Sequence, residues 1–580
     1  MFSCCSNLEN INLENINTTN IIDMSYMFSG CLKLKELDLS YFDTSKVEDM
    51  SYMFFRCYEL TNIDLSKFIT KKVKNMSCML YSCLGLTNIN FSSFDTKNVK
   101  DMSNLLNQCF NLEELDLSFF HTHNVTNMDG LFSECQNLKN INFISFFNTE
   151  NVTNMKNLFN GCYNLVNINS LSLNTKNVTE ISGLFKDCRN LMSIDLSLFQ
   201  LKNVKDISDL FFGCEKIISL DLSSFKTKGI INMKNLFFDC SGLECLDLSS
   251  FDTKTVTDMS NMFNNCNNLI DINISSFNTE NAKNISGMFK NCKKIKSLNL
   301  ASFNTKNVTN MSYLFYGCNN LENIDLSNFN IENVQNMKYM FSHCSKLSDL
   351  NLSSFDTHKV KFMNGLFIGC KNLISLNLSS FNIENIREIK SLFEDCIKLE
   401  NLDLSSFNTE KISNMRYVFY QCISLKSIDL SNLDTRNVIN MNCLFYNCRN
   451  LKKLDVSNFN TQNVTDMGSL FAGCSNLISL DLTNFNTQNV TNMKGLFAGC
   501  SNLISLDLSN FDTKNVTDMQ DLFSDCSKLV SIDLSSFDTR NVVKMNNIFN
   551  NCKSLIDIDL SSFDIRNVKE VENMFSKVII

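Results

Sequence analysis

Cysteines recur through this chain at an almost constant interval. From Cys5 the step is 26 residues, a single 27-residue step separates Cys135 from Cys162, and the 26-residue step then holds to Cys552. Twenty-two of the 26 cysteines fall in this register. A fixed period of this length along a whole chain is the signature of a solenoid, in which each unit buries its apolar face only against its neighbours.

Every unit repeats one apolar pattern. In the unit from Cys292, Leu298-Asn299-Leu300 alternates inward and outward, which predicts a short strand. Residues 308–318 place apolar side chains at three- and four-residue spacing, which predicts a short helix with Thr305 as its N-cap. We therefore expect an α/β repeat solenoid of about 22 coils, with parallel strands on the concave face and short helices on the convex face.

The repeat resembles a known family. The order L-x-x-L-x-L, then Val, Met, an apolar-Phe pair and x-x-Cys resembles the BspA-like leucine-rich repeats. The 26-residue period and the phrase Phe-Asp-Thr-Lys-Asn-Val-Thr-Asp-Met at residues 511–519 resemble the bacterial surface-protein variant of that family. This resemblance covers essentially all 580 residues. It implies a cell-surface or secreted protein that mediates adhesion and partner binding, with no catalytic residues.

The composition favours a single solenoid over residues 1–580. There is no Pro, only 16 Gly, and no Pro/Gly/Ser-rich linker. An extra residue near Phe143 and Ser170 in place of an inward Leu predict a bulge or kink between residues 143 and 173. No terminal cap is visible, and uncapped coils expose core edges, so end-to-end self-association is an expectation.

The cysteine column is expected to lie in the core as free thiols. It contains no C-x-x-C pair and no His at ligand spacing, and it falls on the buried side of the predicted helix. Stacked cysteines approach disulfide spacing, which is the alternative. Reduced thiols favour a reducing compartment, so a cytoplasmic location stands as the alternative to the cell surface.

Several function classes are disfavoured. The net charge is −9 and no Lys/Arg run offers a phosphate-binding stripe, so no nucleic acid is expected. No apolar run approaches the ~20 residues of a membrane span, and no signal peptide is visible. His121 and His123 form the only close histidine pair. With no catalytic motif and no unique carboxylate pair, we expect no enzyme, cofactor or metal.

An Asp/Asn column lies between the two inward leucines of each strand and should therefore face outward on the concave side. A solvated polar face encoded by the repeat is one interpretation, and an acidic face that binds protein or glycan ligands is the other. Like charges one strand apart repel, so something should offset them. The last seven members are all Asp: Asp403, Asp429, Asp455, Asp481, Asp507, Asp533 and Asp559.

Aromatic residues flank the core Phe in some coils and form candidate patches on the opposite face. They are interpreted either as partner contacts or as side chains partly buried between neighbouring coils. The candidates are Tyr26, Tyr52, Phe55, Tyr81, Phe212, Phe238, Tyr313, Tyr316, Tyr339, Tyr417, Tyr420 and Tyr446. Together with the acidic column they predict a non-catalytic binding or adhesion module; an intracellular protein–protein interaction scaffold is the alternative.

Overall fold

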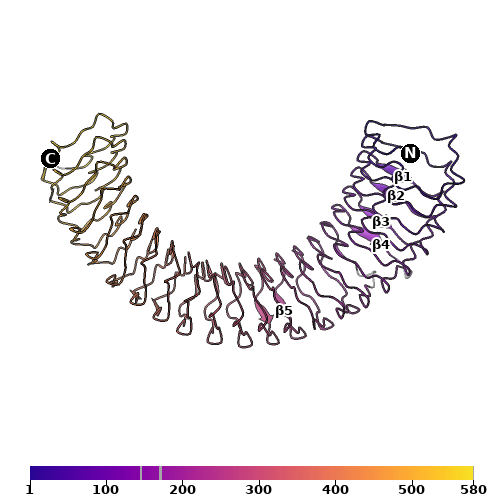
Figure 1. Ribbon diagram of the computed structural model, residues 1–580, viewed down its shortest axis with the longest axis horizontal. Coiled ribbons are helices and arrows are strands. Elements are labelled where there is room, and N and C mark those ends of the chain that lie inside the picture. Colours follow the sequence, from indigo (N-terminus) through magenta and orange to yellow (C-terminus); the bar gives the residue numbers. More distant parts are fainter. Residues whose placement is uncertain (144–146, 169–172, 579–580) are drawn as a thin grey trace. The chain divides into compact units, whose positions relative to one another are not determined.

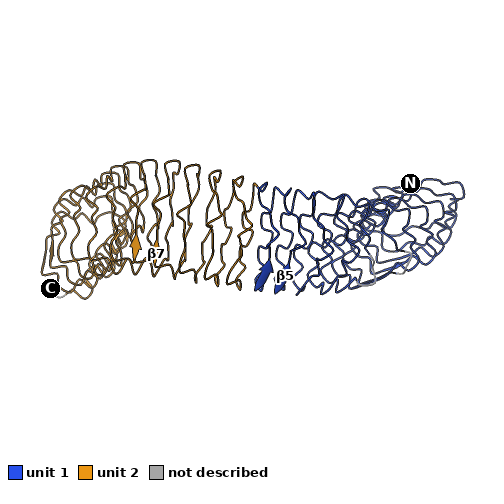
Figure 2. Ribbon diagram, turned by 90° about the horizontal axis from the view of Figure 1, so that it is seen from below, with its two compact units in different colours: residues 1–282 blue, residues 283–580 orange. Residues whose placement is uncertain are grey.

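The computed structural model describes residues 1–143, 147–168 and 173–578. The chain divides into two compact units, residues 1–282 and 283–580, which Figure 2 shows in separate colours. Within each unit the chain winds in successive coils that stack on one another (Figure 1). Each unit is thus a parallel solenoid, as predicted, whereas one continuous solenoid over both units stays a prediction.

Each strand is very short and pairs in parallel with the equivalent residues of a neighbouring coil, 26 residues away. In β1, Asn62 and Asp64 are exposed and Ile63 between them is buried, which is the predicted alternation. The pairs are β1–β2, β3–β4, β5–β6, β7–β8 and β9–β10. The strands are β1 (Asn62–Asp64), β2 (Asn88–Asn90), β3 (Glu114–Asp116), β4 (Asn140–Asn142), β5 (Cys245–Asp247), β6 (Asp271–Asn273), β7 (Ser375–Leu376), β8 (Asn401–Leu402), β9 (Ser531–Ile532) and β10 (Asp557–Ile558).

The predicted helices on the convex face are wrong: across the described ranges the structure has no helix. In residues 493–499 alternate amides donate to carbonyls of the next coil at 2.7–3.0 Å, and the amides between them close turns on carbonyls three residues earlier. Gly495 and Gly499 have φ of +59° and +72°, which a right-handed helix excludes. Successive β-turns therefore replace the helix.

The turns also explain why the pattern resembled a helix. Leu496, Ala498 and Cys500 each donate an amide N–H to the carbonyl three residues earlier, so the chain changes direction at nearly every residue pair. Consecutive turns bring one apolar side chain inward every three or four residues, close to the helical period of 3.6. The positive-φ positions of these turns are mostly Gly, Asn or Asp, as type II turns require.

The core of each unit is a set of stacked columns. The predicted Leu, Val, Met and Phe columns are buried, and many of their side chains are inaccessible to solvent. In most coils a Phe precedes the Cys by three residues and stacks on its equivalents in the neighbouring coils. Phe367, for example, lies 5.9 Å from Phe341 and 5.7 Å from Phe393, measured between ring centroids, with rings within 4° of parallel.

From Cys31 onward the cysteine column lies in this core, as predicted, whereas Cys5 is exposed. The buried thiols are hydrogen-bond donors. Cys500 Sγ donates to the carbonyl of Phe471 in the preceding coil at 3.2 Å, and the same contact recurs along both units. Burial raises the pKa of the Cys83 thiol to about 12, so this thiol keeps its proton at neutral pH. All 26 cysteines lie in the described part of the chain, and none is in a disulfide.

A buried threonine in most coils joins one coil to the next. Thr461 Oγ1 donates to the carbonyl of Asn486 at 2.9 Å and accepts the amide N–H of the same Asn486 at 2.8 Å. Thr305 likewise donates to the carbonyl of Asn330 at 2.8 Å. The prediction that Thr305 caps a helix is therefore wrong, because its hydroxyl bonds to the following coil.

Replacing Thr461 by valine should lower the free energy of unfolding by about 1–3 kcal/mol, because the carbonyl and amide of Asn486 both lose the buried Thr461 hydroxyl as their partner while side-chain volume is kept. Urea denaturation followed by circular dichroism measures this loss. Thr461→Ser is the matched control, since it keeps the hydroxyl, and it should be less destabilised than the valine variant. Equal stability of Thr461→Val and wild type would contradict the role of the hydroxyl.

The predicted bulge falls partly on residues 144–146 and 169–172, which lie outside the described residues. On either side of the first segment, Phe143 and Phe147 are both buried, with ring centroids 4.8 Å apart. Asn127 still pairs in parallel with Asn154, 27 residues later. The coil-to-coil contacts therefore continue past the extra residue.

Candidate functional site

The seven-aspartate column, Asp403 to Asp559, lies on the strand face, which we define as the side bearing the outward side chains of the strands. All seven side chains are exposed. Each Oδ1 accepts the amide N–H of the residue two positions later at 2.8–3.0 Å, as Asp481 does from Thr483. The carboxylate thus starts the turn that follows each strand, a second role typical of Asp.

These hydrogen bonds also set the charge of the column. In Asp507 the amide N–H and the hydroxyl of Ser509 both lower the carboxyl pKa below its usual value. In Asp481 the same contacts from Thr483 lower the pKa, although the neighbouring Asp455 and Asp507 act in the opposite direction. The column is therefore ionised at neutral pH, and its members repel one another.

The first unit relieves this repulsion in a way that the seven-aspartate column does not. There, Asn142 Nδ2 donates to Asp116 at 3.1 Å, and Asn273 Nδ2 donates to Asp247 at 2.9 Å. From residue 403 onward no Asn interrupts the column. In the described part of the second unit, none of the seven carboxylates lies within 4.0 Å of a Lys or Arg nitrogen.

Aliphatic side chains are exposed beside the last four aspartates, three residues earlier in each coil. Ile478, Ile504, Val530 and Ile556 are 52%, 49%, 39% and 80% exposed. We call these four residues the aliphatic stripe. Our sequence-based prediction missed it. The same position is charged in some earlier coils, as at Glu400 and Lys426, and aliphatic in others, as at Ile374, so only an alignment of the coils reveals the run of four. The strand face there is both acidic and apolar.

The strand face is also hollowed where the aspartate column begins. A depression of about 710 Å³ lies over β7, β8 and the coil that follows them. Its lining residues are Ser375, Leu376, Asn377, Ser379, Asn401, Leu402, Asp403, Ser427, Ile428 and Asp429.

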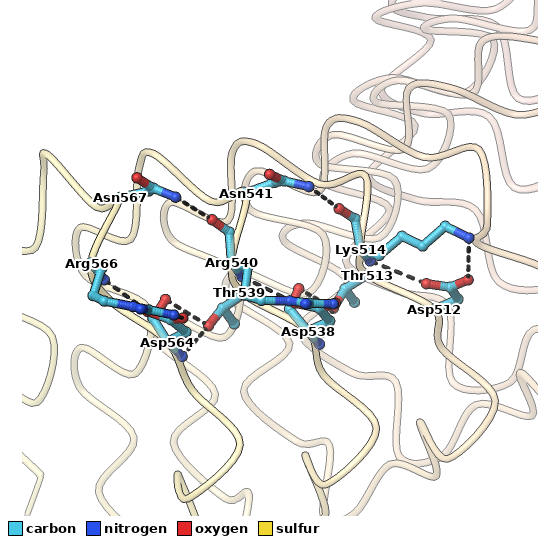
Figure 3. A network of polar contacts seen from close by, with 10 residues as sticks. All are labelled: Asp512, Thr513, Lys514, Asp538, Thr539, Arg540, Asn541, Asp564, Arg566 and Asn567. Carbon is cyan, nitrogen blue, oxygen red and sulfur yellow. Dashed lines mark hydrogen bonds and ion pairs between the residues drawn. The ribbon is translucent and has the colours of Figure 1, made fainter.

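In several coils, an aspartate of the next turn is neutralised within the chain by an arginine two residues later. Figure 3 shows Arg540 against Asp538 and Arg566 against Asp564, while Asn567 Nδ2 donates to the carbonyl of Arg540 at 2.7 Å. Hydrogen bonding to Arg566 lowers the pKa of Asp564 to about 2. In these turns an arginine compensates the negative charge of Asp538 and of Asp564. The seven-aspartate column has no such compensation from the residues that the structure describes.

The candidate aromatic residues gather into stacked clusters on the turn side of the coils, and not on helices. Tyr26 is exposed and the others are half-buried. Aromatic pairs of this kind stabilise one another beyond the area they bury. The stacked pairs are Tyr26–Tyr52, Phe55–Tyr81, Phe212–Phe238, Tyr313–Tyr339 and Tyr420–Tyr446, with centroids 4.6–5.1 Å apart; Tyr316 and Tyr417 contact Tyr313 and Tyr420.

Five of these tyrosines have a left-handed backbone, which is unusual for a bulky residue. Their φ angles lie between 57° and 61°. Cations lie over two of these tyrosine rings: Lys290 is 5.1 Å from the Tyr313 ring and Arg416 is 4.4 Å from the Tyr417 ring. Stacking and cation–π contacts offset the backbone cost within the chain. The five are Tyr26, Tyr52, Tyr313, Tyr339 and Tyr417.

Among the residues that the structure describes, no group of three or more His, Cys, Asp or Glu side chains is placed to hold a metal ion. Within the same residues, no helix has the length and apolar character needed to cross a membrane.

A family model matches the chain in six overlapping segments: residues 1–115, 107–219, 191–298, 285–402, 370–480 and 473–579. Its description is "Mycoplasma protein of unknown function, DUF285". The chain belongs to the DUF285 family. Since the DUF285 segments follow one another through both units, one repeated family accounts for the whole chain, and the assignment to a leucine-rich repeat family is confirmed. No curated protein sequence matches the chain.

Solved leucine-rich repeat structures are similar to this DUF285 chain. A leucine-rich cell surface protein from Faecalibacterium prausnitzii is 22% identical, with 53% of this chain and 78% of that one covered and a TM-score of 0.34. A leucine-rich repeat protein from Bacteroides ovatus is 16% identical, with 75% and 87% covered and a TM-score of 0.30. The functional domain of InlJ from Listeria monocytogenes, which includes a cysteine ladder, is 13% identical, with 71% and 63% covered and a TM-score of 0.24.

Proposed function

We propose that the chain is a non-catalytic binding module whose strand face, over residues 403–559, binds a basic segment of a protein partner. The observation that carries the proposal is the run of seven exposed carboxylates, one per coil, without an intramolecular cation. Strands stack at ~4.8 Å, so the charges form a closely spaced line. A partner cation offsets the repulsion that Asn residues relieve elsewhere in the column.

The aliphatic stripe narrows the chemistry of the partner. Exposed Ile and Val side chains beside the carboxylates favour a segment that presents apolar residues together with Lys or Arg. Charge complementarity of this kind directs association and sets register, and the apolar contacts supply much of the affinity. An amphipathic basic peptide therefore fits this face better than a neutral glycan does.

The proposal treats residues 1–580 as one solenoid of about 22 coils. The cysteine step stays at 26 residues from Cys266 through Cys292 to Cys318, which supports a continuous repeat across the division between the units. Among the described residues the seven exposed carboxylates recur in a column along the coils, which supports a binding role over an enzymatic one. The aromatic clusters are proposed as a second contact surface, supported by their partial exposure.

The location of this module is proposed to be the cell surface, on the resemblance to BspA-like repeats. The free thiol column favours the alternative, an intracellular scaffold. Labelling intact cells with a reagent that does not cross membranes separates the two: labelled protein supports the surface, and protein labelled only after lysis supports the scaffold.

Neutralising three column residues should weaken binding of a synthetic peptide that alternates Lys with Leu. We expect Asp455→Asn, Asp481→Asn and Asp507→Asn together to raise the dissociation constant about 10-fold, since exposed charge pairs contribute ~0.2–1 kcal/mol each. Isothermal titration with the full chain measures this change. Asparagine keeps the side-chain oxygen that accepts the turn amide, so the fold should be preserved.

A matched variant, Glu332→Gln, Glu384→Gln and Glu410→Gln, removes the same charge from exposed turns away from the strand face and should leave binding unchanged. Binding should weaken with salt. Because the column pKa values lie below the usual Asp value, the carboxylates stay charged at pH 5, and affinity at pH 5 should equal that at pH 7. Equal loss in both triple variants, or tighter binding of a neutral oligosaccharide than of the peptide, would overturn the proposal.

A further inference from the structure

One coil of the second unit departs from the repeat at Phe362. This position belongs to the column of isolated parallel bridges, which in most coils holds Asp, Asn or Glu. The Asp or Asn side chain there accepts the amide N–H two residues later, as Asn336 does from Lys338 at 3.1 Å. Phe362 has no oxygen to accept this hydrogen bond, and its ring is 47% exposed. Phe362 therefore gives up the turn hydrogen bond of this column without becoming buried, and such a departure from a local pattern is typical of a functional position.

Phe362 lines a pocket of about 470 Å³, which is within the range of sites for small ligands. The other lining residues are Lys338, Lys361, Asn364, Asn385, Arg387 and Glu388. Lys338 Nζ lies over the Phe362 ring, 4.7 Å from its centroid. The pocket therefore joins an aromatic surface to cationic groups on a protein whose net charge is −9.

The charges around the pocket are unbalanced. Three cations line it, and Glu388 is the one acid among the lining residues that the structure describes. Glu388 accepts a hydrogen bond from Asn364 Nδ2 at 3.2 Å, and Lys361 donates to the amide oxygen of Gln335 at 3.3 Å. In the described structure none of the three cations lies within 4.0 Å of a carboxylate oxygen. The local excess is two positive charges.

We propose that this pocket binds a phosphate monoester that carries an aromatic ring. A phosphate monoester has a charge of ≈ −1.5 to −2 at pH 7, which matches the excess better than a single carboxylate does. Arg387 offers a planar fork of donors suited to phosphate oxygens, and the lysines act as point charges. The ring of the ligand packs on Phe362. A nucleotide and a phosphorylated tyrosine share this chemistry.

Isothermal titration of the full chain with phenyl phosphate and with adenosine monophosphate tests the pocket. We expect at least one of them to bind saturably at one site, at least about 10-fold more tightly than inorganic phosphate, which lacks the ring, and than adenosine, which lacks the charge. If phenyl phosphate binds more tightly than adenosine monophosphate, the natural ligand is a phosphorylated tyrosine. If adenosine monophosphate binds more tightly, the natural ligand is a nucleotide.

Two variants return the pocket to residues found at the same positions in other coils, so both should fold. Phe362→Asn restores the usual column residue, and Arg387→Thr restores the residue at position 309. Each should weaken binding at least about 10-fold with an unchanged melting temperature. Lys283 occupies the position equivalent to Arg387 in another coil, outside the pocket. Lys283→Thr removes one positive charge there and should leave ligand binding unchanged. Absence of saturable binding, equal binding of inorganic phosphate, or unchanged binding by Phe362→Asn would overturn the proposal.

Discussion

Replacing Phe367 by alanine should lower the free energy of unfolding by about 3–5 kcal/mol, the usual cost of truncating a buried aromatic side chain. Phe367 is inaccessible to solvent and stacks on the equivalent ring in the coil on either side. Truncation removes both stacking contacts and leaves a cavity that the neighbouring coils fill poorly, because their backbones are hydrogen-bonded to one another.

Urea denaturation measures this loss. Since each coil of a solenoid contacts only its neighbours, we also expect the transition to broaden, as the coils on either side of the lesion lose cooperativity. Phe362→Asn, five residues away on the surface, is the matched control and should change stability by less than about 0.5 kcal/mol. A loss below about 1 kcal/mol for Phe367→Ala would contradict the assignment of this column as the core.

Thiol reactivity should divide the 26 cysteines into sharply different classes. Cys4, Cys5 and Cys245 are exposed and should react quickly with an aromatic disulfide reagent at pH 8, and Cys443, which is half-buried, more slowly. The other 22 are buried. Their reaction should be slower by about three orders of magnitude or more, because attack needs the thiolate and therefore an opened coil.

The release of the coloured thiolate, with and without guanidinium, measures both classes. Three fast thiols are expected in the native protein and 26 after unfolding. Burial raises the pKa of the core thiols, so raising the pH from 7 to 9 should speed the exposed class far more than the buried class. Cys245→Ser should remove one fast thiol, whereas Cys240→Ser, in the core, should remove none. Fewer than 26 thiols after unfolding would reveal disulfides and contradict the structure.

The sequence was sufficient to predict the solenoid and its core, because each buried column is a direct result of the period. Val490, Met493 and Phe497 are all buried, and the equivalent positions of the other coils hold apolar residues as well. The helix was wrongly predicted because the same spacing arises from successive turns. A helix and a series of turns differ in the carbonyl to which each amide N–H donates. Gly495 donates to the carbonyl of Gln520, 25 residues later, and no local sequence pattern reveals such a distant partner.

The hydrogen bonds of the core could not be predicted from the sequence for the same reason: their donors and acceptors lie in adjacent coils and not in one local segment. In the sequence, Cys500 resembles a small apolar core residue and Thr461 resembles a helix cap. In the structure, the Cys500 thiol and the Thr461 hydroxyl each donate to a backbone carbonyl of an adjacent coil. The alternation of inward and outward residues predicted that the seven aspartates are exposed, whereas their role in partner binding stays a prediction. The aliphatic stripe and Phe362 were missed because they emerge only when the coils are compared position by position. The stripe is a run of four consecutive aliphatic residues at a position of mixed character, and Phe362 replaces the polar residue that most coils hold.

The contacts that join neighbouring coils have one more consequence. Thr461 and Cys500 bond to partners one coil away, and the link from Cys162 to Phe132 spans the 27-residue coil with the same geometry. Excising or duplicating 26 residues between equivalent positions therefore rejoins donors and acceptors of the same kinds. Recombination between repeats within a gene can lengthen or shorten such a protein in whole coils, and each event adds or subtracts one carboxylate from the line that faces a partner.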